Sequence, residues 1–204
     1  MRGVTGDHYF TAEPDAATAG AERTVEFAAG GHEFRLRAAG GVFSAYRLDP
    51  GTGVLLRKAD LPGPTATGTL LDLGCGYGPI ASVLATVAPR ATVYAVDVNA
   101  RARALAAANT GPLGVRVCTP DEVDEAVRFD EIWSNPPIRI GKTELHALLA
   151  RWLPRLAPDG VAWLVAGRHL GGDSLQRWLV DQGWQVDRHA SQKGFRVFRV
   201  ARPS

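Results

Sequence analysis

The residues with the clearest chemical meaning form a glycine-rich loop, Asp72-Leu-Gly-Cys-Gly-Tyr-Gly-Pro, which follows an apolar run. Glycine lets the backbone turn sharply and lets a ligand touch the main chain. The spacing of Gly74, Gly76 and Gly78 differs from the Gly-x-Gly-x-x-Gly of dinucleotide loops, and Asp72 would repel a pyrophosphate. The loop therefore favours a ligand with a cationic amine, and we read Cys75 as a small packing residue beside that ligand rather than as a nucleophile.

An acidic residue follows the next apolar run of the chain. Asp97 comes directly after the run 92–96 and nineteen residues after Gly78. An acid at this place accepts hydrogen bonds from the two hydroxyls of a ribose. We therefore expect Asp97 to bind a ribose and Asn99 to border an adenine. Asp121 has two interpretations, as a ligand of the adenine amino group or as part of a solvated acidic loop.

The third motif is Ser134-Asn-Pro-Pro-Ile, which follows another apolar run. Pro136 and Pro137 are stiff and cannot donate backbone hydrogen bonds. The side-chain carbonyl of Asn135 and the main-chain carbonyl of Pro136 can then face one target, a planar NH2 group whose lone pair is directed at an activated methyl. Alignment of this kind supplies much of a rate acceleration. We therefore expect these three residues to be catalytic, in a methyl transfer from S-adenosylmethionine to nitrogen.

Together the motifs resemble those of class I methyltransferases that modify exocyclic or amide nitrogens. The sequence is similar in particular to the methyltransferase small domain (RsmC-like) family of ribosomal RNA guanine-N2 methyltransferases. The likeness covers nearly the whole chain. Besides the three motifs, it rests on His8-Tyr-Phe, Gly41-Val-Phe-Ser, Leu48-Asp-Pro-Gly-Thr, Val96-Asp-Val-Asn and Lys193-Gly-Phe-Arg-Val. The resemblance implies S-adenosylmethionine as the cofactor, ribosomal RNA as the partner and the N2 amine of a guanine as the acceptor.

One position departs from the family pattern. Many members have an aromatic residue after Asn-Pro-Pro, where it stacks on the target base, and this chain has Ile138. Because stacking on an aromatic side chain is worth about 1–3 kcal/mol, the departure leaves the identity of the base open. Arg139 and Lys142 follow, and we expect them to meet phosphates beside a flipped nucleotide, with ordinary surface charge as the alternative.

Two other functions fit parts of the same pattern. Asn-Pro-Pro loops also serve the methylation of adenine N6 and of glutamine amides in proteins, so a protein or a small-molecule acceptor stays open. A methyltransferase-like domain that binds RNA or a partner without catalysis is the other alternative. The intact Asp72, Asp97 and Asn135 argue against it.

The elements that must position these residues alternate between strand-like and helix-like runs from residue 67 onward. This alternation predicts a doubly wound α/β sheet with helices on both faces. The strands are expected at 68–73, 92–96, 115–118, 129–134, 161–166, 184–187 and 194–200, and the helices at 80–87, 101–109, 144–156 and 174–180. The short last connection predicts an antiparallel pair, as in the Rossmann-like class I methyltransferase fold, whose seven-stranded, mostly parallel sheet has an antiparallel last strand.

The first third of the chain has a different pattern. Alternating runs at 24–27 and 32–37 flank Gly30-Gly31 and predict a β-hairpin, and residues 53–58 have room for one or two helical turns. We therefore divide the chain into an N-terminal extension, residues 1–66, with the hairpin packed on the core, and a cofactor-binding core, residues 67–204.

Composition excludes several classes of protein. The two cysteines lie in no metal-ligand spacing, which predicts that no metal is bound. No apolar run approaches the roughly 18 residues of a spanning helix, so we expect a cytoplasmic protein without a membrane partner. The net charge is only +2, but from residue 132 onward eleven Lys and Arg stand against five Asp and Glu. This excess favours RNA contact or is ordinary solvated charge.

Overall fold

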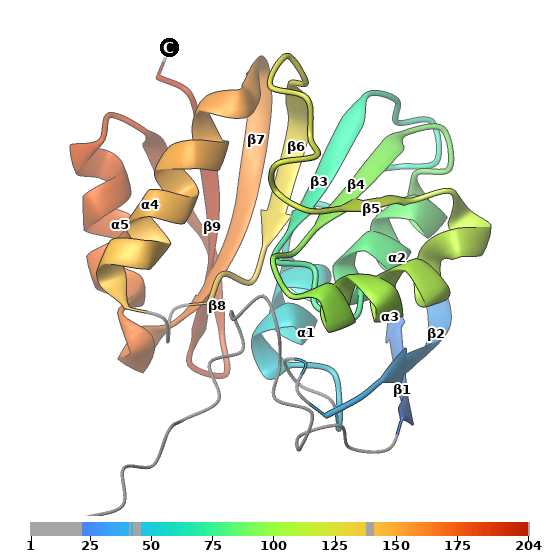
Figure 1. The fold of residues 1–204 in the computed structure, drawn as a ribbon. Helices are drawn as coiled ribbons and strands as arrows, with labels where there is room; N and C mark the ends of the chain where they lie inside the picture. Colours follow the sequence, from blue (N-terminus) through green and yellow to red (C-terminus); the bar gives the residue numbers. More distant parts are fainter. Residues whose placement is uncertain (1–21, 41, 43–45, 138–140, 204) are drawn as a thin grey trace, which may run out of the picture.

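The computed structural model describes residues 22–40, 42, 46–137 and 141–203 (Figure 1). It contains one seven-stranded sheet and a separate two-stranded hairpin. The strands of the large sheet are β3 (Thr69–Leu73), β4 (Thr92–Val96), β5 (Arg116–Cys118), β6 (Phe129–Ser134), β7 (Leu156–Gly167), β8 (Gln185–Gln192) and β9 (Phe195–Ala201). The helices are α1 (Pro50–Lys58), α2 (Pro79–Val87), α3 (Ala100–Thr110), α4 (Lys142–Trp152) and α5 (Gly172–Asp181).

The strand order confirms the predicted fold class. The order is β5-β4-β3-β6-β7-β9-β8, and the first five strands run parallel to one another. Strand β9 is antiparallel to both β7 and β8, so the last strand lies one position inside the edge of the sheet. Because parallel strands end at the same edge of a sheet, the segments after β3, β4 and β6 meet there. These are the segments that carry the three motifs.

Alternate residues of the central strands point into two different apolar layers. Leu70 of β3 belongs to the layer formed with α1, α2, α3 and the hairpin. Its neighbour Leu71 belongs to the layer formed with α4 and α5. This period of two, on a sheet covered on both faces, explains why the strands read as continuous apolar runs. The two layers of helices flank the sheet in Figure 1.

The described part of the N-terminal segment packs on the same face as α2 and α3. Strands β1 (Arg23–Ala29) and β2 (His32–Ala38) form the predicted hairpin. The backbone N–H of Arg37 donates to Asn109 Oδ1 over 2.9 Å, and Asn109 Nδ2 donates back to the Arg37 carbonyl over 2.8 Å, which ties β2 to α3. Helix α1 packs against β7, β8 and β9. The hairpin and α1 therefore share a core with the sheet.

Two of the helix boundaries that differ from the sequence prediction have clear local reasons. Helix α1 begins at Pro50 rather than near residue 53, because Asp49 accepts the Thr52 N–H over 3.0 Å as an N-cap and proline suits the first helical position. Helix α4 ends at Trp152, and a 3-10 turn that contains Pro154 follows it. Among the described residues no helix is long and apolar enough to cross a membrane.

Candidate active site

The glycine loop connects β3 to α2 in a backbone conformation that other residues rarely adopt. Gly74, Gly76 and Gly78 have φ angles of 74°, 56° and 87°. The N–H groups of Gly74 and Cys75 both donate to the Val96 carbonyl, over 2.8 and 3.0 Å, so the loop is fixed to the end of β4. The loop therefore presents its main chain at the carboxyl edge of the sheet.

Asp72 lies beneath this loop rather than on its surface. The carboxylate is fully buried, and its Oδ2 accepts the N–H of Ala81 in the first turn of α2 over 2.9 Å. Burial raises the pKa of Asp72 to about 8, and the nearby charge of Asp97 adds to the rise. The other oxygen, Oδ1, has no hydrogen-bond partner among the described residues. Asp72 thus links the loop to α2, and contact with a cationic amine stays a prediction.

Asp97 fixes the loop from the neighbouring strand. Its Oδ2 accepts the Gly76 N–H and its Oδ1 accepts the Asn99 N–H, each over 2.9 Å. The carboxylate is 7% exposed, and burial raises its pKa although these backbone bonds act in the opposite direction. Asn99 is buried and caps α3 by accepting the Ala102 N–H over 3.0 Å. A carboxylate has about four lone-pair sites, so Asp97 retains acceptor capacity for the predicted ribose.

Asn135 lies at the end of β6, across from the glycine loop. Its Nδ2 donates to Asp49 Oδ1 over 2.7 Å and to Thr52 Oγ1 over 3.0 Å. The next residue, Pro136, is buried, and Pro137 is half-buried. The amide of Asn135 is therefore held by two side chains from the start of α1.

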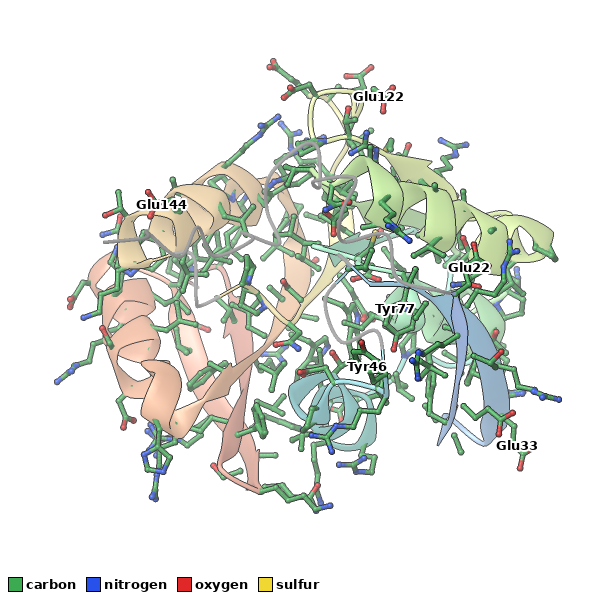
Figure 2. All side chains as sticks on the ribbon, turned by 60° about the horizontal axis from the view of Figure 1, so that its bottom comes forward. Glu22, Glu33, Tyr46, Tyr77, Glu122 and Glu144 are labelled. Atoms are coloured by element: carbon green, nitrogen blue, oxygen red, sulfur yellow. The ribbon has the colours of Figure 1, made fainter. Side chains whose placement is uncertain are left out.

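A pocket connects these parts. Its lining consists of Asp49, Thr52, Gly74, Cys75, Gly76, Tyr77, Pro79, Ile80 and Asn135. A Cβ built on Gly74 or on Gly76 would meet no atom within 4 Å, so both glycines border open space. In Figure 2 the side chain of Tyr77 lies where the glycine loop, the hairpin and α1 come together.

Several pocket residues were not predicted. Asp49 and Thr52 come from a segment that sequence reasoning had treated only as part of the family resemblance, although Asp49-Pro50 is itself a helix-start signal. Tyr77 is 2% exposed, and its hydroxyl has no partner among the described residues. Burial raises the pKa of Tyr77, and the charge of Asp49 adds to this.

Other predicted site residues lie elsewhere. Asp121 is exposed and pairs with Arg151 over 2.7 Å, an arrangement that favours the solvated-loop interpretation over an adenine contact. Lys142 is exposed at the start of α4. Ile138 and Arg139 lie outside the described residues, as do Phe43 and Ser44 of the resemblance.

Cys75 is buried within the glycine loop. Cys75 is 3% exposed, and burial raises its thiol pKa well above the ordinary range, as expected for a packing residue. Within residues 22–40, 42, 46–137 and 141–203, no group of His, Cys, Asp or Glu is arranged to hold a metal ion.

The described site fits S-adenosylmethionine. The open space beside Gly74 and Gly76 gives a ligand access to the main chain, and the buried acids Asp72 and Asp97 surround the loop with acceptors rather than cations. This suits a ligand with an amine and ribose hydroxyls better than a pyrophosphate. Asn135 lines the same pocket, and its amide oxygen can act as a further acceptor.

Comparison with known proteins gives the family. Residues 33–199 match the methyltransferase small domain family. The chain is 30% identical to the uncharacterized protein YbxB of Bacillus subtilis over 200 residues, which cover 95% of this chain and 98% of that protein. It is 34% identical over 137 residues to ribosomal RNA small subunit methyltransferase C of Shewanella oneidensis, and the match covers 64% of this chain but only 39% of that protein.

A solved structure has the same fold. The 16S rRNA N2 methyltransferase RsmC of T. thermophilus, in complex with AdoMet and guanosine, superposes with a TM-score of 0.73 at 24% identity, and the match covers 89% of this chain and 51% of that chain. The chain thus spans about half or less of the RsmC proteins that it matches. With the family match over most of its length, the chain belongs to the methyltransferase small domain family and is an S-adenosylmethionine-dependent methyltransferase.

Proposed function

We propose that this methyltransferase acts on ribosomal RNA and methylates the exocyclic N2 amine of a guanine. The observation that carries the proposal is the position of Asn135, whose amide lies in the pocket opposite the main chain of the glycine loop. The relatives named for ribosomal RNA methylation, and the solved RsmC with guanosine, support this acceptor.

In this proposal each side of the pocket has a separate task. S-adenosylmethionine, when bound, supplies a methyl group that is activated on a sulfonium sulfur. The main chain of residues 74–78 and the carboxylate of Asp97 bind this cofactor. Asn135 Oδ1 and the Pro136 carbonyl accept the two hydrogens of the amine, so that its nitrogen lone pair is directed at the methyl. The stiffness of Pro136 and Pro137 keeps these acceptors in place, and the proton of the product leaves to solvent.

The N-terminal segment takes part in the same site. We place the boundary at residue 66, with residues 1–66 as an extension and 67–204 as the core. The extension supplies Asp49 and Thr52 to the pocket lining. Ile138 is proposed to contact the target base, and Arg139 and Lys142 to bind phosphates of the flanking RNA. The basic charge excess after residue 132 supports this assignment.

The test is to identify the acceptor directly. Purified protein is incubated with tritiated S-adenosylmethionine and, separately, with naked ribosomal RNA, each ribosomal subunit, transfer RNA and total protein. We expect label in ribosomal RNA, and chromatography of its nucleosides should show N2-methylguanosine. Label in N6-methyladenosine or in methylated glutamine would overturn the proposed acceptor. Cofactor binding without transfer to any fraction would instead favour a non-catalytic RNA-binding domain.

A further inference from the structure

We infer that Asp49 is a positioning residue: together with Thr52 it fixes the Asn135 side chain in the one orientation that turns Oδ1 toward the acceptor amine. The inference rests on the proposed function only in treating Asn135 as the residue that receives the amine. It assigns a role in the reaction to the N-terminal extension, which precedes the cofactor-binding motifs in the chain.

Both hydrogens of the Asn135 amide are used in this arrangement. Asp49 Oδ1 lies 2.7 Å from Asn135 Nδ2, and Thr52 Oγ1 lies 3.0 Å from the same nitrogen. An NH2 group has two donors and the amide oxygen has none. A half-turn of the amide would therefore replace two hydrogen bonds with an oxygen facing a carboxylate oxygen. Because a hydrogen bond to an ionised acceptor is stronger than a neutral one, Asp49 contributes most of this preference.

Asp49 is itself held in place by the start of α1. Its Oδ1 also accepts the Thr52 N–H over 3.0 Å, so the same atom caps the helix and holds Asn135. A Cβ on Gly51 would lie 2.9 Å from Asp49 Oδ1 and 3.0 Å from the ring of Phe195, so only glycine lets β9 pack this closely on the helix start. Thr52 is 4% exposed. The packing of the start of α1 against β9 therefore holds the two acceptors in place.

Two substitutions separate positioning from helix capping. Serine is as good an N-cap as aspartate, but its oxygen lies about one bond length nearer the backbone, so Asp49→Ser keeps the cap and loses the contact with Asn135. Thr52→Val removes the other acceptor from a buried site with little change of shape. Asp49→Asn is the conservative variant, because its amide oxygen can still accept from both donors. Asp60→Ser, on an exposed residue after α1, is the matched control.

A direct readout needs no methyl acceptor. The chain contains three asparagines, Asn99, Asn109 and Asn135, so asparagine-selective isotope labelling gives three pairs of side-chain amide signals in NMR. We expect the Asn135 amide hydrogens to exchange with water roughly tenfold faster or more in the Asp49→Ser/Thr52→Val double variant. The signals of Asn99 and Asn109 should not move. The Asp49→Asn variant, whose additional asparagine gives a fourth pair of signals, should keep part of the slow exchange at Asn135. Unchanged exchange at Asn135 would overturn the inference.

The consequence for catalysis is measured with tritiated S-adenosylmethionine and whichever acceptor fraction takes label. The double variant should lower kcat about tenfold or more with an unchanged Kd for S-adenosylmethionine, and should have no further effect in an Asn135→Ala background. An equal loss in both backgrounds would show that Asp49 touches substrate or cofactor itself, and would overturn the inference. Failure of the proposed acceptor leaves the NMR result intact, so the two failures are distinguishable.

Discussion

One side of the pocket is formed by main-chain groups and the other by side chains. On one side, residues 74–78 present backbone groups in a conformation that their glycines allow, and the loop is fixed by hydrogen bonds to Val96 and Asp97 of the neighbouring strand. On the other side, Asn135 presents a side chain that is held by two other side chains, Asp49 and Thr52. The backbone side is local in the chain, whereas the side-chain side joins residues 86 positions apart.

In the proposed function, this difference separates cofactor binding from chemistry. A backbone surface holds whatever fits against it and tolerates few changes of residue type at its glycines. A side-chain acceptor can be removed without disturbing the loop across from it. Substitutions on the two sides should therefore affect different kinetic constants.

The largest effect is expected from Asn135→Ala. In the proposed mechanism the variant loses the acceptor that aligns the amine, and removing one such group from an active site costs about 10²–10³ in kcat. Because the glycine loop makes no hydrogen bond to this side chain among the described residues, the Kd for S-adenosylmethionine should stay within about twofold. Single-turnover rates and calorimetry measure the two constants. If most turnover survives in a variant that binds cofactor normally, the alignment mechanism is wrong.

The next effect concerns the buried acid beneath the loop. The pKa of Asp72 is about 8 in the folded protein against 3.8 for an ordinary aspartate. Between about pH 4 and pH 8 the folded protein therefore holds a proton that the unfolded chain releases, so the free energy of unfolding falls by up to about 1.4 kcal/mol per pH unit as pH rises through this window. The stabilisation from Asp72 is fully present below its pKa in the unfolded chain, 3.8. It is lost as the pH rises through its pKa in the folded protein, about 8.

The variant Asp72→Asn removes this pH dependence, because an amide cannot ionise and its oxygen still accepts the Ala81 N–H. We expect the Tm of the variant minus that of the parent protein, both without cofactor, to increase from pH 5 to pH 8. The same change at the exposed Asp187 controls for the loss of one carboxylate. Equal pH profiles for the parent and the variant would mean that Asp72 is ionised in the folded protein throughout this range.

The sequence predicted the backbone side well because its signals are local. The alternate glycines between an apolar strand and Pro79 specify both the loop and the strand–helix unit around it. It did not predict that one oxygen of Asp72 accepts the Ala81 N–H of α2. The direction of a side chain at the end of a strand depends on which neighbouring N–H groups lack a partner, and that is settled only when α2 packs on the sheet.

The sequence predicted only part of the side of the pocket that is formed by side chains. Asn135-Pro-Pro stood out as a motif, but nothing near it in the chain indicates that its amide is held from α1. Asp49 and Thr52 are ordinary helix-start residues until the sheet brings β6 beside them. Contacts between side chains far apart in the sequence depend on the order of the strands in the sheet. The motifs indicate that order only through the family resemblance. The prediction that Asp121 binds adenine was weak because acids are common in exposed loops.

A smaller effect tests the backbone side. Gly76→Ala directs a methyl group into open space beside the loop at a φ of 56°. We expect the Kd for S-adenosylmethionine to rise about tenfold, equivalent to about 1.4 kcal/mol, with kcat at saturation little changed. Gly114→Ala is the matched control, since its φ is 70° and its Cβ also meets nothing within 4 Å, but it lies outside the pocket lining. A fall in kcat without a change in Kd would break the division between the two sides.

The smallest effect on cofactor binding is expected from substitutions in the turn between β1 and β2. A Cβ on Gly30 would lie 2.6 Å from Val87 Cγ1 at the end of α2 and 3.3 Å from Leu61 Cδ1 after α1, whereas a Cβ on Gly31 would meet nothing within 4 Å. Both glycines have positive φ, so both alanine variants carry backbone strain, but only Gly30→Ala adds overpacking of about 1–3 kcal/mol. Its Tm should lie several degrees below that of Gly31→Ala.

Because neither residue lines the pocket, both variants should bind S-adenosylmethionine alike at a temperature where they are folded. Unequal Kd values would mean that the hairpin shapes the cofactor site through α2.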